Sequence, residues 1–252
     1  MEFFFGVPVP PYSALEELGL QRFELLSWTI DGCTLAIPLM EYAPQRFRAS
    51  AFDAVGIRLP EHIARSVVRR QADYFFGRLA ARSALEHYGL AHRQVATGEQ
   101  REPVWPAGVV GSITHAAPWC AAAVLPSSRW RGVGIDIELP LDADARASVI
   151  ATALSADERA VLAECGAAMP EATLLTLAFS AKESFYKGMH SSVGRFFGFE
   201  AMRILAIDPE RGYLDFITTE RLGEDMPGGA AGRVHFRMLR DGAVLTAFVR
   251  TA

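Results

Sequence analysis

Lysine is almost absent from this chain. Two of its 252 residues are lysine, Lys182 and Lys187, and the other basic side chains are arginine or histidine. An ammonium is a compact point charge, whereas a guanidinium is a wide planar fork. Two lysines within six residues, next to the carboxylate of Glu183, indicate a site that requires a compact cation, as phosphate chemistry does.

Cysteine is scarce as well. The three cysteines lie far apart and form no C-x-x-C pair, which excludes a disulfide framework and gives no support to a zinc site. The first residues lack the basic and apolar regions of a signal peptide, and no apolar run is long enough to span a bilayer. We therefore expect a cytoplasmic protein with no membrane partner.

The balance of charge excludes a further class. A formal net charge of -4 argues against a general binder of nucleic acid or anionic membranes. Residues 58–82 reverse this balance locally, because six arginines against two acids give a local charge of +4. Such a short basic stretch suits a small polyanion better than a long one.

Hydrophobic patterning predicts an α+β protein of two subdomains, 1–130 and 131–252. In the first, residues 60–89 have helical spacing, two strand-like runs follow, and the first 50 residues contain five prolines and read as an irregular extension with short strands. The second half repeats the pattern coarsely, with a capping box at 155–158 and an Asp-Gly turn signal at 241–242. Its expected elements are strands at 133–139, 203–207, 214–218, 234–240 and 243–249 and a long helix at 171–187.

Two carboxylates share one face of the strand at 133–139. Asp136 and Glu138 are two residues apart, so they point the same way while Ile135 and Ile137 point into the core. Paired carboxylates repel each other unless a cation lies between them, and a hard divalent ion such as magnesium fits oxygen ligands. The alternative is a strand edge with two solvated acids.

A third carboxylate and a cation lie on the long helix. Glu183 and Lys187 are four residues apart and share a helix face, which can place both over one site. Two plain alternatives exist: Ser180 and Glu183 match a capping box, and Glu183 with Lys187 matches an ordinary surface pair. Neither alternative explains why both lysines lie here.

These residues resemble the signature motifs of the 4′-phosphopantetheinyl transferases. The segments 132–138 (GVGIDIE) and 179–187 (FSAKESFYK) are similar to the two main motifs. Upstream, 77–82 (GRLAAR), 101–106 (REPVWP) and 111–115 (GSITH) resemble blocks of the larger, monomeric class, in the branch that serves enterobactin-type synthetases. The resemblance covers about half of the chain, from residue 70 to residue 199.

The resemblance implies a pseudo-dimer of two similar α+β subdomains with coenzyme A in the cleft between them. It implies a cytoplasmic, monomeric transferase that moves 4′-phosphopantetheine from coenzyme A to a serine of an apo acyl or peptidyl carrier protein in nonribosomal peptide or siderophore synthesis. Mg²⁺ would be held by Asp136, Glu138 and Glu183, and Glu183 and Lys187 would be catalytic. The implied coenzyme A contacts are Arg78, Arg82, Arg101, Thr114, His115, Lys182 and Lys187.

Two other classes remain open on the residues alone. A magnesium-dependent nuclease also uses acids and a lysine, but such sites commonly show E-x-K, and the acidic net charge disfavours long nucleic acid. A non-catalytic coenzyme A or carrier-binding module would keep the arginines but has no need of three acids. For carrier docking we expect an apolar patch within Met189–Phe199; its alternative is ordinary core.

Overall fold

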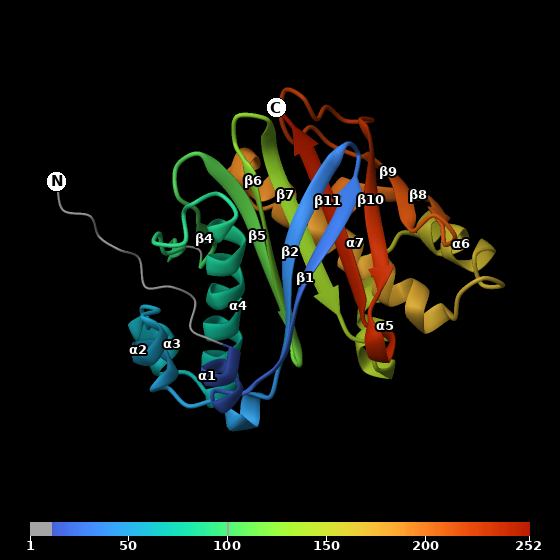
Figure 1. Ribbon diagram of the computed structural model, residues 1–252. Coiled ribbons are helices and arrows are strands. Elements are labelled where there is room, and N and C mark those ends of the chain that lie inside the picture. Colours follow the sequence, from blue (N-terminus) through green and yellow to red (C-terminus); the bar gives the residue numbers. More distant parts are fainter. Residues whose placement is uncertain (1–11, 100) are drawn as a thin grey trace. The chain divides into compact units, whose positions relative to one another are not determined.

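The structure, a computed structural model, describes residues 12–99 and 101–252 (Figure 1). The first eleven residues of the predicted N-terminal extension lie outside it. The chain separates into two compact units between Arg129 and Trp130, and each unit carries an antiparallel sheet with one long helix packed on it. The predicted α+β class with two similar halves is confirmed. Within the described residues, no helix is both long enough and apolar enough to cross a bilayer.

The first unit has a four-stranded sheet in the order β1-β2-β6-β5. The long helix α4 packs on β2, β5 and β6, and its buried Phe75 and Phe76 join an aromatic core with Tyr42, Phe47 and Phe52. The elements of this unit are α1 (Tyr12–Glu17), β1 (Leu20–Ile30), β2 (Cys33–Tyr42), η1 (Pro44–Arg46), α2 (Ala51–Val55), α3 (Glu61–Ala64), α4 (Val68–Glu86), β3 (Ala96–Thr97), β4 (Pro103–Val104), β5 (Val109–Ala116) and β6 (Trp119–Pro126).

Strands were expected within the first 50 residues and are found, but the irregular structure expected around them is wrong for residues 12–50. β1 and β2 form one long hairpin whose turn is Asp31-Gly32, with both residues at positive φ (45° and 74°). An Asp-Gly pair is a strong hairpin signal, so the turn was visible in the sequence. Proline does not interrupt this hairpin, because Pro38 lies inside β2 and is paired with Leu25 of β1.

The predicted helix at 60–89 is in fact two helices. α3 ends at Ala64 and α4 begins at Val68. The side-chain amide of Gln71 donates to the carbonyls of Ala64 (3.1 Å) and Ser66 (2.9 Å), so it satisfies backbone acceptors that the break leaves open.

The second unit has a five-stranded sheet in the order β7-β11-β10-β9-β8. The helix α7 packs on β7, β11 and β10, and the capping box at Ser155 and Glu158 forms as predicted. The strands and the long helix expected here are confirmed, whereas α5 was not expected. The elements are β7 (Trp130–Glu138), α5 (Ala143–Thr152), α6 (Ala156–Glu164), α7 (Glu171–Val193), η2 (Phe199–Ala201), β8 (Met202–Asp208), β9 (Tyr213–Thr218), β10 (Ala231–Met238), η3 (Arg240–Gly242) and β11 (Val244–Thr251).

Candidate active site

Glycines bring helix α7 unusually close to strand β7. A Cβ atom at Gly134 would lie 1.8 Å from the carbonyl oxygen of Ser184, and one at Gly188 would lie 2.6 Å from Cδ1 of Phe248. Any larger residue would therefore push the helix away from the sheet. Because side chains alternate along a strand, Asp136 lies on the same helix-facing side of β7 as Gly134.

Asp136 is the centre of this contact. It is only 3% exposed, its Oδ2 accepts a hydrogen bond from Ser180 Oγ (2.8 Å), and its Oδ1 accepts one from Lys187 Nζ (2.5 Å). Thr246, which pairs with Asp136 across β7 and β11, donates to the carbonyl of Ser180 (2.9 Å). A buried carboxylate is thus held by a cation and a hydroxyl, which compensates part of its desolvation.

The position of Ser180 and Glu183 settles one alternative. Both lie inside the 23-residue helix α7, whose first residue is Glu171, so they do not form a capping box. Lys187 pairs with Asp136 on the sheet, and its side chain is 28% exposed. Lys187 of α7 therefore takes part in a helix–strand contact with Asp136, and does not form an ordinary surface pair with Glu183.

Two further carboxyl groups, those of Glu138 and Glu183, lie beside the Asp136–Lys187 pair. Burial, followed by the charge of Asp136, raises the pKa of Glu138 to about 7, although Lys187 opposes the shift. Burial also raises the pKa of Glu183, again with Asp136 adding to the shift and Lys187 opposing it. One ammonium faces three carboxyl groups, so ionisation of all three would leave an excess of negative charge in the site.

The donor set fits a hard divalent cation. Asp136, Glu138 and Glu183 offer oxygen ligands, and the charge of Asp136 adds to the raised pKa of both glutamates, so the three carboxylates act on one another. Over residues 12–99 and 101–252, no three His, Cys, Asp or Glu side chains already stand as a ready-made metal cluster. Magnesium is commonly bound by one or two carboxylates together with phosphate oxygens, which is compatible with this arrangement.

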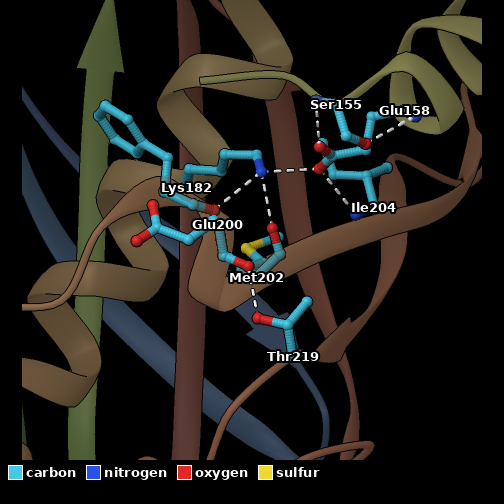
Figure 2. A network of polar contacts seen from close by, with 8 residues as sticks. Ser155, Glu158, Lys182, Glu200, Met202, Ile204 and Thr219 are labelled. Atoms are coloured by element: carbon cyan, nitrogen blue, oxygen red, sulfur yellow. Dashed lines mark hydrogen bonds and ion pairs between the residues drawn. The ribbon is translucent and has the colours of Figure 1, made fainter. Parts of the chain in front are cut away.

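Lys182 lies in the core, and its placement corrects the prediction that it contacts coenzyme A. Its side chain is 1% exposed, and its ammonium forms an ion pair with Glu158 Oε1 at 2.7 Å (Figure 2). It also donates to the carbonyls of Phe199 (3.0 Å) and Met202 (2.6 Å). All three of its donors are used within the protein, so none is left for a ligand.

The first unit contains an arginine-lined pocket on one face of α4. Its lining includes Arg58, Arg78, Arg82 and Arg93 and contains no Asp or Glu. Burial lowers the pKa of both Arg78 and Arg82, and neither shift is offset by a carboxylate. Uncompensated positive charge of this kind favours an anionic ligand.

The two predicted arginines of this pocket differ in their freedom. Arg82 is buried, and its terminal nitrogens donate to the carbonyls of Val55 (2.7 Å) and Gly56 (3.0 Å), so it secures the end of α2 rather than facing a ligand. Arg78 lies over the ring of Tyr74 and donates to Thr97 Oγ1 (3.1 Å). Its buried Nε has no hydrogen-bond partner among the residues that the structure describes.

The remaining predicted contacts lie on β5 and in the loop between β3 and β4. Thr114 is buried, whereas His115 is exposed and its Nε2 lies 3.3 Å from Nη1 of Arg70. Arg101 is exposed and has the left-handed φ of 68°. The structure thus brings together Asp136, Glu183 and Lys187 in the second unit, and adds Arg70 to His115 in the first.

Sequence reasoning missed two groups of site residues. Ser180 was read only as a possible cap and Thr246 was not considered, because their link to Asp136 exists only when α7 and β11 meet β7. Arg58 and Arg93 belong to the arginine-lined pocket; the basic stretch at 58–82 pointed to the first but not to the second. For these residues the sequence signal was composition alone.

The predicted docking segment Met189–Phe199 divides between core and surface. Met189 (0% exposed) and Phe197 (4%) are core residues, whereas Phe196 is 78% exposed. Phe196 lines an aromatic pocket of about 170 Å³ together with Glu183, Tyr186, Phe197 and Phe199. The segment therefore exposes a single large apolar side chain, Phe196, beside a pocket and not a continuous apolar patch.

Comparison with known proteins gives consistent matches across both units. Residues 59–125 match the model of the 4′-phosphopantetheinyl transferase N-terminal domain, and residues 132–225 match that of the 4′-phosphopantetheinyl transferase superfamily. The chain is 34% identical to 4′-phosphopantetheinyl transferase Svp of Streptomyces mobaraensis, over 70% of this chain and 72% of that protein. It is 34% identical to enterobactin synthase component D of Salmonella typhi, over 67% and 72%.

A more distant likeness is found among solved structures. The holo-[acyl-carrier-protein] synthase of Thermotoga maritima matches with a TM-score of 0.36 and 16% identity, over 48% of this chain and 63% of that one.

Proposed function

Since the chain belongs to the 4′-phosphopantetheinyl transferase family, we propose that it transfers 4′-phosphopantetheine from coenzyme A to a serine of an apo carrier protein. The serine oxygen attacks the phosphorus that bears pantetheine, the pyrophosphate bond breaks, and 3′,5′-bisphosphoadenosine leaves. The observation that supports this reaction best is the group of three carboxylates, Asp136, Glu138 and Glu183, that shares the single ammonium of Lys187.

The second unit carries the chemistry in this proposal. Asp136, Glu138 and Glu183 would hold Mg²⁺, and the bound ion would offset negative charge on the pyrophosphate. Lys187 adds its ammonium to the same charge, and its exposed fraction of 28% leaves it open to a ligand while Asp136 fixes its position. Glu183, whose pKa is raised by burial, accepts the proton of the attacking serine. Positioning and electrostatics then provide most of the acceleration.

The first subdomain, 1–130, binds the nucleotide end of coenzyme A in this proposal. Arg78, Arg101, Thr114 and His115 are the proposed contacts, and Arg82 supports them by fixing the chain at Val55 and Gly56. The four arginines that line this small pocket, with no acid among them, make its mouth favourable for a phosphate. Subdomain 131–252 holds the metal ligands.

The partner and the setting belong to the same proposal. We place the enzyme in the cytoplasm as a monomer that serves acyl or peptidyl carrier proteins, in nonribosomal peptide or siderophore synthesis. No nucleic acid or membrane takes part in the proposed reaction.

One experiment separates this function from its two rivals. The protein is incubated with coenzyme A, Mg²⁺ and an apo carrier protein, and the carrier is weighed by mass spectrometry. A gain of one phosphopantetheine group supports transfer. A carrier that binds without gaining mass indicates a binding module, and cleavage of added DNA or RNA under the same conditions indicates a nuclease.

A further inference from the structure

Glu158 and Lys182 form a buried ion pair that joins three separate segments of the second unit. Their side chains are 4% and 1% exposed, and the two charged groups are 2.7 Å apart. Glu158 lies in the first turn of α6 and Lys182 in the middle of α7 (Figure 2). Apart from Ser155 at the start of α6, the backbone groups that they bind lie between Phe199 and Ile204.

Every polar atom of this pair has a partner in the protein. Lys182 donates to Glu158, to the carbonyl of Phe199 and to the carbonyl of Met202. Glu158 accepts hydrogen bonds from the backbone N–H of Ser155 (2.8 Å) and of Ile204 (3.0 Å). A fully satisfied network of this kind rigidifies its surroundings, whereas a partly satisfied one is costly.

The backbone that Lys182 holds is one wall of the aromatic pocket. Phe199 and Met202, whose carbonyls it binds, line that pocket, and Glu183 lies on the same lining. On the far side of this wall, Thr219 Oγ1 donates to the carbonyl of Glu200 (2.5 Å), so the same short segment is tied from both directions.

We infer that Glu158 and Lys182 are positioning residues that fix the wall of the aromatic pocket relative to Glu183. The inference rests on the proposed transferase function for its kinetic consequences. The pocket fits an uncharged chain with apolar sides, either the pantetheine portion of coenzyme A or an apolar side chain of the carrier protein. Without the pair, residues 199–204 lose three hydrogen bonds. The wall that they form is then no longer held at a fixed position relative to Glu183.

A set of variants separates positioning from simple stabilisation. Removing one charge, as in Lys182→Met or Glu158→Gln, leaves a buried group unsatisfied and lowers the melting temperature strongly. Replacing both, as in E158M/K182M, removes both charges together, so stability recovers in large part. The matched control is Asp215→Asn, which breaks the half-exposed Asp215–Arg233 pair between β9 and β10 of the same unit.

The decisive readouts are made on the folded double variant. We expect its KM for coenzyme A or for the carrier to rise on the order of tenfold to a hundredfold, because small misplacements in a site have effects of that size. The substrate whose KM rises identifies the occupant of the pocket. Amide hydrogen exchange, measured without substrates, should quicken at residues 196–204 and remain unchanged in β7 and β11.

Three outcomes would overturn the inference. The first is a stable double variant with wild-type kinetics and exchange, and the second is faster exchange spread over the whole unit. The third is a double variant that unfolds like the single ones, because the pair would then serve the fold itself. Failure of the wild-type protein to modify any carrier would instead count against the transferase function, since the exchange measurement does not depend on turnover.

Discussion

At the scale of single residues, the two lysines of this chain have opposite environments. Lys187 has a quarter of its side chain open to solvent and shares its charge with Asp136, whereas Lys182 is sealed in the core with Glu158. The scarcity of lysine indicated a special site at both positions. The structure supports a ligand-facing role for the first and a structural one for the second.

Lys187→Arg tests whether a compact ammonium is needed. The wide guanidinium cannot keep the short contact with Asp136 Oδ1 and also face the pyrophosphate in the same place. We expect kcat to fall on the order of a hundredfold, with the melting temperature within a few degrees of wild type. Wild-type turnover in this variant would show that the lysine is only a compositional accident.

The raised pKa of Glu138 predicts how the metal-free protein responds to pH. The group ionises at its ordinary value of 4.5 in the unfolded chain and at about 7 in the fold. Between these values the folded state binds more protons, so the free energy of unfolding falls as pH rises and levels off above about 7. Urea unfolding, measured across this pH range with a chelator present to keep the protein free of metal, should show this fall in the free energy of unfolding. The Glu138→Gln variant should show a smaller fall.

The same sign applies to metal binding. A carboxylate must lose its proton to bind Mg²⁺, so affinity should rise as pH rises through about 7 and then remain constant. Added Mg²⁺ should restore stability above that pH in the wild type. If Mg²⁺ stabilises Glu138→Gln equally well, Glu138 is not a ligand.

At the scale of elements, the site depends on how closely α7 approaches β7. The glycines of the 132–138 segment were read as part of a motif, but their physical task is to let the carbonyl of Ser184 rest on the strand. That contact fixes the distance between α7 and β7, and so allows Ser180 and Lys187 to bond to Asp136. The bonds to Asp136 thus depend on the close approach of α7 that the glycines of β7 permit.

Gly134→Ala should separate the helix from the strand. The added methyl would lie 1.8 Å from the Ser184 carbonyl, which is backbone and cannot swing aside, so we expect a loss of about 1–3 kcal/mol or more in the free energy of unfolding. Turnover should fall further than stability explains. Gly223→Ala is the control, because its nearest neighbour is the side chain of Asp225 at 3.2 Å; equal effects in both variants would argue against the close contact.

The segment after α7 gives a second test at this scale. Phe196→Ala removes an exposed ring, so it should raise the KM for the carrier while folding and the KM for coenzyme A remain unchanged. Phe197→Ala, the buried neighbour, should cost about 3–5 kcal/mol of stability. A proportional rise in both KM values for Phe196→Ala would contradict carrier docking at this residue.

How much of this was readable in the sequence depends on the range of the interactions. The β7 strand, the capping box at Ser155 and the Asp241-Gly242 turn follow local rules and were predicted. The burial of Lys182 was not, because its partners Glu158 and Met202 lie 24 and 20 residues away and meet it only after α6, α7 and β8 have packed. The site's charges could be listed from the sequence, but not which of them were already paired.

At the scale of the whole molecule, the net charge is negative, but one stretch of the chain is strongly positive. The net charge is -4, yet residues 58–82 carry +4. We expect moderate salt to raise the KM for coenzyme A, whose phosphates meet the arginines, and to change the KM for an acidic carrier only slightly. A carrier KM that rises more steeply with salt than the coenzyme A KM would mean that broad electrostatic attraction drives docking.

The burial of Lys182 has a practical consequence for labelling. With the ammonium of Lys182 enclosed by Glu158 and two carbonyls, an amine-reactive reagent applied to the folded protein has a single lysine side chain to modify, Lys187. A fluorophore, an affinity tag or a cross-linker aimed at lysine would therefore report on the neighbourhood of Asp136 without any engineered cysteine. Apart from the α-amino group of the chain, Lys187 is thus the amine on which such a reagent would act.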